Sequence, residues 1–335
     1  MIDPSACSLS SSKISQETPA TLEALLQRPK AEVHVHIEGA TPPAVFWQMA
    51  QKNNVSLPAN TLQEWEQFYH FKDFNHFIEV YTLASTCIQR PEDYQALVLG
   101  FMASQAEQGI VHSDAFLSSS LSLGKFCQSE WIACLKEALV LGQQRYGVTV
   151  NLIPDISREL PHTQEAVLAF VLEGQRAGVF TGLGLGGIEA EFPPRLFMET
   201  FAEARRHGLH VVAHAGEAAG PESVWQALEL LHAERIGHGV RCLEDPVLVD
   251  YLRDHQIPIE VSPTSNYCTG VVPKGQPHPI HAMVQAGLCI TLNSDDPPMF
   301  GTTLAGEYAL LYQQGMSLSA LEQLRLNTWT SAFKA

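Results

Sequence analysis

The segment RLFMETFAEARRHGLHVVAHAGE, residues 195–217, contains the repeating unit that decides the fold. Its first part has apolar residues at helical spacing and ends in basic residues before Gly208, which is typical of a helix C-terminus. The apolar run HVVAH, residues 210–214, follows, and its length suits a buried strand. Polar residues from His214 to Glu217 come next. The unit is therefore a helix, a glycine, a strand and a polar turn.

The same unit recurs along the chain. Helical patterns at 91–108, 130–146 and 164–177 end at Gly109, Gly147 and Gly178, and an apolar run follows each. Strands are predicted at AEVHVH (31–36), IVHSDAF (110–116), VTVNLI (148–153), TGLGL (181–185), HVVAH (210–214), RIGH (235–238), PIEVS (258–262) and CITLNS (289–294). Apolar strands that alternate with helices indicate a parallel sheet covered by helices. Eight such units predict an α/β fold, a (β/α)₈ or TIM barrel.

The stretch 37–108 is too long for one connection between strands, so we expect extra helices inserted after strand 1. They either cover the barrel mouth or pack as ordinary buried helices. The competing architecture is a doubly wound open sheet, but its glycine-rich phosphate loop is missing from HVHIEGA, residues 34–40. We expect residues 1–20 to be a flexible N-terminal tail and residues 21–335 to be a single domain.

The composition limits the possible partners. The chain has 335 residues, of which 45% are hydrophobic, so it can bury a large core. Its net charge of −16 argues against nucleic acid and anionic membranes as partners. The seven cysteines are scattered and form no C-x-x-C pair, which favours reduced thiols. We find neither a signal peptide nor a membrane span in the sequence and expect a cytoplasmic protein.

Polar residues stand where several predicted strands end. His34 and His36 are two residues apart on one strand, so both imidazoles face the same side. His214 and Asp295 stand at the ends of two other strands, and the carboxyl ends of barrel strands converge on one rim. Three imidazoles and one carboxylate suit zinc with room for a water. The alternative for His34 and His36 is a hydrogen-bonded pair of core histidines.

Three further residues have both a functional and a structural interpretation. Glu217 is either a proton shuttle beside the metal or a helix-start carboxylate. His238 is either a base or orienting group near the metal or a histidine satisfied by backbone groups. Asp296 either faces a ligand or forms a turn before two prolines. The proposed metal site favours the functional interpretation of each.

Five motifs resemble the adenosine deaminase family of the metal-dependent amidohydrolase superfamily. They are PKAEVHVHIEGA (29–40), HAGE (214–217), RIGHGV (235–240), SPTSN (262–266) and LNSDDP (292–297), in the order and approximate spacing of that family. The resemblance covers residues 28–332. It implies a barrel enzyme with one zinc ion per chain, which replaces the 6-amino group of a purine by oxygen and releases ammonia.

The resemblance also implies roles for individual residues. The zinc ligands would be His34, His36, His214 and Asp295. Glu217 would protonate the purine N1, and His238 would orient the attacking water and help to deprotonate it. Asp296 would bind N7, the backbone N–H of Gly187 would meet N3, and Glu38 would lie near the ribose 5′ group. The expected substrate is adenosine or deoxyadenosine; adenine and 6-amino-6-deoxyfutalosine are the alternatives.

The chain departs from the family pattern in three places. Strand 4 of the family reads Asp-Leu-Ala-Gly-Asp-Glu, whereas residues 184–189 read GLGGIE. Ser262 replaces a frequent cysteine, and Glu38 replaces the Asp of nucleoside-specific members. Glu at that position also occurs in members that act on free adenine. Against adenine, PTSN (263–266) and DDPPMF (295–300) differ from the Pro-Leu-Ser-Asn and Asp-Asp-Pro-Ala-Tyr-Phe of the adenine-specific branch and look closer to bacterial adenosine deaminase-like enzymes.

A hydrolase with a different leaving group and a binding protein without catalysis are the other possible functions. A metal-dependent hydrolase of phosphoesters or amides usually has two metals bridged by a carboxylated Lys on strand 4, and VFTGLGLGG, residues 179–187, contains no Lys. A binding protein without catalysis would have one altered catalytic position, and we find none. The glycines of that segment are interpreted as allowing a ligand close to the backbone. The sequence predicts no oligomeric state.

Overall fold

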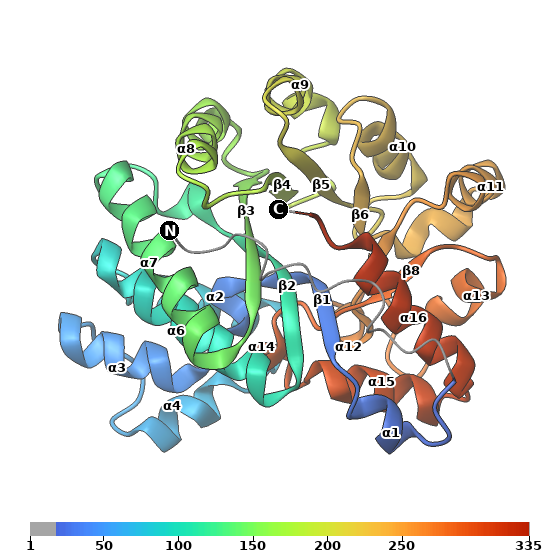
Figure 1. Cartoon of the computed structure of the whole chain (residues 1–335), viewed down its shortest axis with the longest axis horizontal. Coiled ribbons are helices and arrows are strands. Elements are labelled where there is room, and N and C mark those ends of the chain that lie inside the picture. Colours follow the sequence, from blue (N-terminus) through green and yellow to red (C-terminus); the bar gives the residue numbers. More distant parts are fainter. Residues whose placement is uncertain (1–17, 335) are drawn as a thin grey trace, which may run out of the picture.

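The computed structural model describes residues 18–334, so most of the expected tail at 1–20 lies outside the described residues. The described chain contains eight parallel strands in chain order, arranged in a ring with helices outside (Figure 1). The strands are β1 Lys30–His36, β2 Ile110–Leu117, β3 Thr149–Ser157, β4 Gly182–Gly186, β5 His210–Ala215, β6 Arg235–His238, β7 Ile259–Val261 and β8 Ile290–Leu292. Each corresponds to a predicted apolar run.

The ring closes between the segment after β8 and β1. Val35 and Asp295 form a parallel bridge. The amide of His36 donates to the carbonyl of Asp295 over 3.1 Å, and the amide of Asp295 donates to the carbonyl of His34 over 3.3 Å. The prediction of a (β/α)₈ barrel is therefore confirmed.

Helices surround the barrel on its outer side (Figure 1). Those of the repeating units are α6 Pro91–Glu107, α7 Gln128–Tyr146, α8 Gln164–Arg176, α9 Met198–Arg206, α10 Pro221–Glu229, α11 Pro246–His255 and α13 Ile280–Gln285. The others are α1 Leu22–Leu26, α2 Ile37–Ala40, α3 Pro43–Asn53, α4 Leu62–Tyr69, α5 Phe74–Thr86, α12 Pro263–Cys268, α14 Pro297–Phe300, α15 Leu304–Gln313 and α16 Leu318–Ser331. Among residues 18–334, no helix is long and apolar enough to cross a bilayer.

Two helix boundaries differ from the sequence prediction. The expected helix at 195–207 is divided into a 3₁₀ turn, Pro194–Phe197, and α9. Pro193 and Pro194 lack an N–H, so the chain enters through a tighter turn before the regular helix begins. The helix expected to begin after Ser129 instead begins two residues earlier, at Gln128, because the amide of Trp131 donates to the carbonyl of Cys127.

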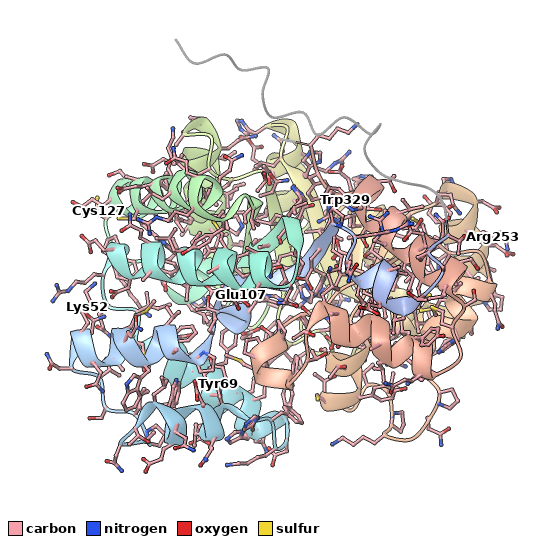
Figure 2. The ribbon with its side chains drawn as sticks, turned by 60° about the horizontal axis from the view of Figure 1, so that its bottom comes forward. Lys52, Tyr69, Glu107, Cys127, Arg253 and Trp329 are labelled. Carbon is pink, nitrogen blue, oxygen red and sulfur yellow. The ribbon has the colours of Figure 1, made fainter. Side chains whose placement is uncertain are left out.

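The insertion after β1 contains the expected extra helices, α2 to α5, followed by α6. Helices α3 and α4 lie together on one side of the molecule, and Figure 2 labels Lys52 and Tyr69 there. The ring of Phe300 in α14 stacks on Phe77 of α5 at 4.9 Å and meets Phe71 at 5.7 Å. Since α14 directly follows Asp296, the insertion packs beside the carboxyl ends of β8 and β1.

The interior side of β4 consists of glycine. A Cβ added at Gly184 would lie 3.0 Å from Asp155 Cβ and 3.0 Å from the Phe116 ring. One added at Gly182 would lie 2.9 Å from the carbonyl oxygen of His210. These glycines therefore make room for neighbouring strands, and at Gly184 the side chains of Phe116 and Asp155 occupy the space beside the backbone.

The lower half of the barrel contains a buried ion network. Arg235 on β6 donates to Asp114 on β2 over 2.6 Å and to Glu260 on β7 over 2.5 Å. The guanidinium also lies 3.6 Å from the ring centre of Phe333, whose amide donates to Asp114. The chain after α16 thus crosses the floor of the ring, where Figure 1 marks the C-terminus.

Candidate active site

Four side chains from three strand ends converge at the upper rim of the barrel. They are His34 and His36 from β1, His214 from β5 and Asp295 after β8, and one potential ligand atom of each lies within 4.8 Å of all the others. Nε2 of His36 is 3.2 Å from Nε2 of His214 and 3.3 Å from Asp295 Oδ1. Nε2 of His34 is 3.4 Å from the same oxygen. The four residues singled out in the sequence are therefore brought together.

Other groups determine which nitrogen of two histidines faces the centre. Nδ1 of His34 donates to Glu260 over 2.7 Å, and Nδ1 of His214 donates to the carbonyl of Leu185 over 3.0 Å. Metal-binding histidines usually have their second nitrogen held in this way. Glu260 was not among the residues predicted from the sequence. Its position within the apolar run PIEVS, where a charged residue needs a buried partner, could have indicated it.

The free atoms at this centre fit a metal ion. Nε2 of His34 and Oδ1 of Asp295 are buried, and neither has a hydrogen-bond partner among the described residues. Burying such polar atoms without a partner costs about 1–3 kcal/mol each, which a cation would offset. Three nitrogens and one carboxylate oxygen form a donor set suited to zinc. These four residues would hold the ion.

Asp295 is held in its ionised form. Burial alone would raise its pKa, but the imidazoles of His34 and His36 hold the pKa well below its ordinary value. Its second oxygen, Oδ2, accepts a hydrogen bond from Ser265 Oγ at 2.7 Å. The carboxylate is therefore oriented with Oδ1 towards the three histidines.

Glu217 lies beside this centre in the turn after β5. Its Oε2 is 3.7 Å from Nε2 of His238. Burial, followed by the negative charges of Asp295 and Glu189, raises the pKa of Glu217 to about 8. A bound divalent cation acts in the opposite direction. The side chain is consequently suited to carry a proton near neutral pH.

Glu189 shapes the turn that carries Glu217. Its carboxylate accepts backbone N–H bonds from Gly216 at 2.6 Å, Glu217 at 3.1 Å, Ala218 at 2.8 Å and Ala219 at 2.8 Å. Because all four donors point at one buried carboxylate, the turn has little conformational freedom. The sequence did not predict that Glu189 would hold the turn after β5, because no local motif links it to that turn.

A chain of hydrogen bonds fixes the tautomer of His238. The amide of Ile280 donates to Nδ1 of His278 over 3.1 Å, so His278 carries its proton on Nε2, which is 3.2 Å from Asn266 Oδ1. The Asn266 amide nitrogen then donates to Nδ1 of His238 over 3.1 Å. Burial lowers the pKa of His238 to about 3. His238 is therefore neutral with its proton on Nε2, which faces Glu217 and Asp295.

Asp296 and Gly39 fit together. Oδ1 of Asp296 is buried and has no hydrogen-bond partner within residues 18–334. A Cβ added at Gly39 would lie 1.5 Å from that oxygen, so only glycine leaves room for the carboxyl group. Burial, together with the charge of Asp295, raises the pKa of Asp296 to about 8.

Glu38 lies in α2, directly after β1, and is only 3% exposed. The amide of Ser118 donates to Glu38 Oε1 over 3.1 Å, and the Ser118 hydroxyl is 2.6 Å from the hydroxyl of Tyr81. Burial raises the pKa of Glu38 to about 7. This carboxyl group is therefore buried and hydrogen-bonded to the segment that follows β2.

Gly187 follows β4 with a φ of +90°, a region that favours glycine. A Cβ there would lie 2.2 Å from Glu159 Oε2. The backbone conformation therefore favours glycine at this position, and a Cβ there would also displace the carboxylate of Glu159.

Comparison with known families identifies the chain. The family described as Adenosine deaminase matches residues 29–335. The chain belongs to the adenosine deaminase family. It is 35% identical over 310 residues to an adenine deaminase of Bordetella avium, which covers 92% of this chain and 98% of that protein. It is 33% identical over 311 residues to an adenine deaminase of Crocosphaera subtropica, covering 92% and 94%.

Solved structures of this family have the same architecture. Adenine deaminase from Arthrobacter aurescens matches with a TM-score of 0.85 and 29% identity over 92% of this chain and 94% of that one. An amidohydrolase from Burkholderia ambifaria with bound Zn matches with a TM-score of 0.83 and 25% identity, covering 92% and 86%. As a member of the adenosine deaminase family, the protein is a hydrolase that acts on C–N bonds in cyclic amidines.

Proposed function

We propose that this member of the adenosine deaminase family deaminates adenine to hypoxanthine with one zinc ion per chain. The proposal rests on the convergence of His34, His36, His214 and Asp295 beside a carboxyl group, Glu217, that holds a proton. The similar proteins named adenine deaminase favour this alternative over the nucleoside expected from the sequence. The buried, hydrogen-bonded Glu38 also supports a free base, because a ribose in its place would have to displace protein groups.

Each polar group has one task in the proposed reaction. Zinc, when bound, lowers the pKa of water and so supplies hydroxide at neutral pH. Protonated Glu217 donates to the purine N1, which prevents negative charge from building on the ring during attack at C6. Protonated Asp296 donates to N7, and the backbone N–H of Gly187 donates to N3.

His238 has a narrower role than the family resemblance implies. With its proton on Nε2, it donates a hydrogen bond to the attacking water or hydroxide and so orients it. In this tautomer Nε2 has no lone pair with which to accept a proton. We therefore propose that His238 orients the attacking water and that another group accepts its proton.

A substrate comparison tests the proposal. The specificity constants of adenine, adenosine, deoxyadenosine, N6-methyladenine and 6-amino-6-deoxyfutalosine are measured from the absorbance change and the release of ammonia. We expect the specificity constant of adenine to exceed that of each nucleoside by at least about 10²-fold, because a ribose would have to displace the groups that bury Glu38. A higher specificity constant for any nucleoside would contradict the proposed substrate. No deamination of any compound by zinc-loaded protein would contradict the proposed reaction.

A further inference from the structure

The three histidines at the metal centre differ in how they are held. His34 and His214 have partners on Nδ1, namely Glu260 and the carbonyl of Leu185. Within residues 18–334, no hydrogen bond holds Nδ1 of His36. Metal-binding histidines almost always donate their second N–H, and losing that partner weakens metal binding or activity about 10–100-fold. Nδ1 of His36 therefore lacks a partner of the kind that orients the other two histidines.

Strand register places one carboxyl group at the height of His36. Side chains that face the interior of a barrel at one height come from alternate strands. His36 on β1 pairs with Phe116 on β2, which pairs with Ile153 on β3. Phe116 and Ile153 both belong to the interior cluster. Asp155 is two residues beyond Ile153, so it faces the same interior.

The strand pairing relates Asp155 to His214 in the same way as it relates His36 to Asp155. Asp155 on β3 pairs with Gly184 on β4, which pairs with Val212 on β5. His214 is two residues beyond Val212, as Asp155 is beyond Ile153. Since Nε2 of His214 lies 3.2 Å from Nε2 of His36, the layer that contains both histidines also contains Asp155.

Asp155 is available for a new contact. Its side chain is 4% exposed, and Oδ1 has no hydrogen-bond partner among the described residues. A Cβ at Gly186 would lie 3.2 Å from Asp155 Oδ2 and 3.6 Å from the His214 ring, so the carboxyl group reaches towards the metal centre.

We propose that Asp155 is the positioning residue of His36: its carboxylate accepts the Nδ1–H of His36, directly or through one water, and keeps Nε2 directed at the metal. The inference rests on the metal centre of the proposed function. It also accounts for the departure in strand 4. The family pattern has Asp at position 184, and here Gly184 leaves that space to a carboxylate supplied by β3.

Zinc affinity in the absence of substrate tests this role. Zinc is titrated into metal-free protein in competition with a chromophoric chelator, for the wild type, Asp155→Asn and Asp155→Ala. We expect the dissociation constant to rise about 10–100-fold in Asp155→Ala and less in Asp155→Asn, which retains an acceptor oxygen. Circular dichroism reports whether each variant is folded. If Asp155→Ala does not fold, the zinc dissociation constant of the near-isosteric Asp155→Asn variant tests the role of Asp155.

A double variant that moves the carboxylate from β3 to β4, together with a control variant, completes the test. The double variant Asp155→Gly/Gly184→Asp should bind zinc more tightly than Asp155→Gly alone, because it returns a carboxylate to the same space from β4. Asp93→Asn removes a buried carboxylate of α6 that binds Lys52 and Asn53, and it should leave zinc affinity unchanged.

Two results would overturn the role of Asp155. One is wild-type zinc affinity in folded Asp155→Asn and Asp155→Ala. The other is a raised KM for adenine with unchanged zinc affinity, which would make Asp155 a substrate contact. Wild-type protein that binds no metal would instead contradict the proposed function itself, so the two failures are distinguishable.

Discussion

At the scale of single residues, the active site controls which atoms carry protons. Glu217 is surrounded by other carboxylates in a buried position, which raises its pKa, whereas burial lowers the pKa of His238. One acid is thus kept protonated and one imidazole is kept neutral within 3.7 Å of each other. Opposite shifts of this kind are typical of groups with different proton-transfer tasks.

Replacing Glu217 by Gln removes the proton that we assign to N1. We expect kcat for adenine to fall about 10²–10⁴-fold, the usual contribution of general acid catalysis. Zinc content should be unchanged because Glu217 is not a ligand, and metal analysis provides this control. Retention of full activity would show that the proton reaches N1 by another route.

The pH dependence follows from the raised pKa of Glu217. The carboxyl group is protonated below its pKa of about 8 and loses its proton as the pH rises through that value. We expect kcat/KM for adenine to fall tenfold per pH unit on the alkaline side, with a midpoint at or below pH 8 because zinc opposes the shift. A profile that rises continuously through pH 9 would contradict this assignment.

Asn266→Asp tests the hydrogen-bond chain behind His238. Aspartate has no N–H to donate, so Nδ1 of His238 would take the proton and Nε2 would become an acceptor. We expect kcat to fall about 10²–10⁴-fold, as in other sites where a histidine adopts the wrong tautomer, with zinc content retained. Asn60→Asp, at an exposed position, is the matched control. Equal activity of the two variants would remove the tautomer argument.

At the scale of secondary-structure elements, glycine determines how closely neighbouring elements approach. The glycine-lined interior face of β4 admits Phe116 and Asp155, and Gly39 in α2 admits the carboxyl group of Asp296. In both cases a residue without a side chain lies on one element and a functional side chain on its neighbour. The geometry of the pocket therefore depends on pairs of elements.

Gly39→Ala tests this dependence. The added Cβ would lie 1.5 Å from Asp296 Oδ1, so the carboxyl group must move away from the position proposed to bind N7. We expect kcat/KM for adenine to fall by at least about tenfold, the effect of losing one hydrogen bond to substrate, with zinc affinity unchanged. Gly220→Ala is the control, since its Cβ would meet nothing closer than 3.5 Å. A fully active Gly39→Ala variant would exclude Asp296 from substrate binding.

At the scale of the whole molecule, a buried ion network joins the metal centre to the barrel floor. Glu260 binds both His34 and Arg235, and Arg235 in turn binds Asp114. Ser331, the last residue of α16, and Phe333, just beyond it, contact the same network. The lower half of the barrel thus holds buried charged groups whose partners come from several strands and from the end of α16.

Arg235→Leu would leave the carboxylates of Asp114 and Glu260 buried without their cation. We expect the free energy of unfolding to fall by about 3–5 kcal/mol, measured by denaturation with urea. Arg253→Leu is the control, because Arg253 forms ion pairs with Asp250 and Asp254 at the surface (Figure 2) and such pairs contribute about 0–1 kcal/mol. A similar small loss in both variants would contradict a structural role of the network.

The sequence predicted the barrel because each strand carries its own local signal, a short apolar run, and most of these runs follow a helical pattern that ends in glycine. The four proposed ligands were also predictable, since the carboxyl ends of parallel strands meet at one rim. The supporting groups were not predictable. Glu189 holds a turn 28 residues away, and Glu260 holds His34 across 226 residues of chain. No periodicity or motif specifies which distant side chains will meet, because that depends on register and packing.

The crossing of the floor by Phe333 has a consequence for synthesis on the ribosome. Asp114 accepts a hydrogen bond from the amide of Phe333, 219 positions further along the chain. A nascent chain therefore emerges with all eight strands complete while its interior floor is still open to water. We expect the barrel to reach its full stability only after residue 333 has left the ribosome and closed the floor.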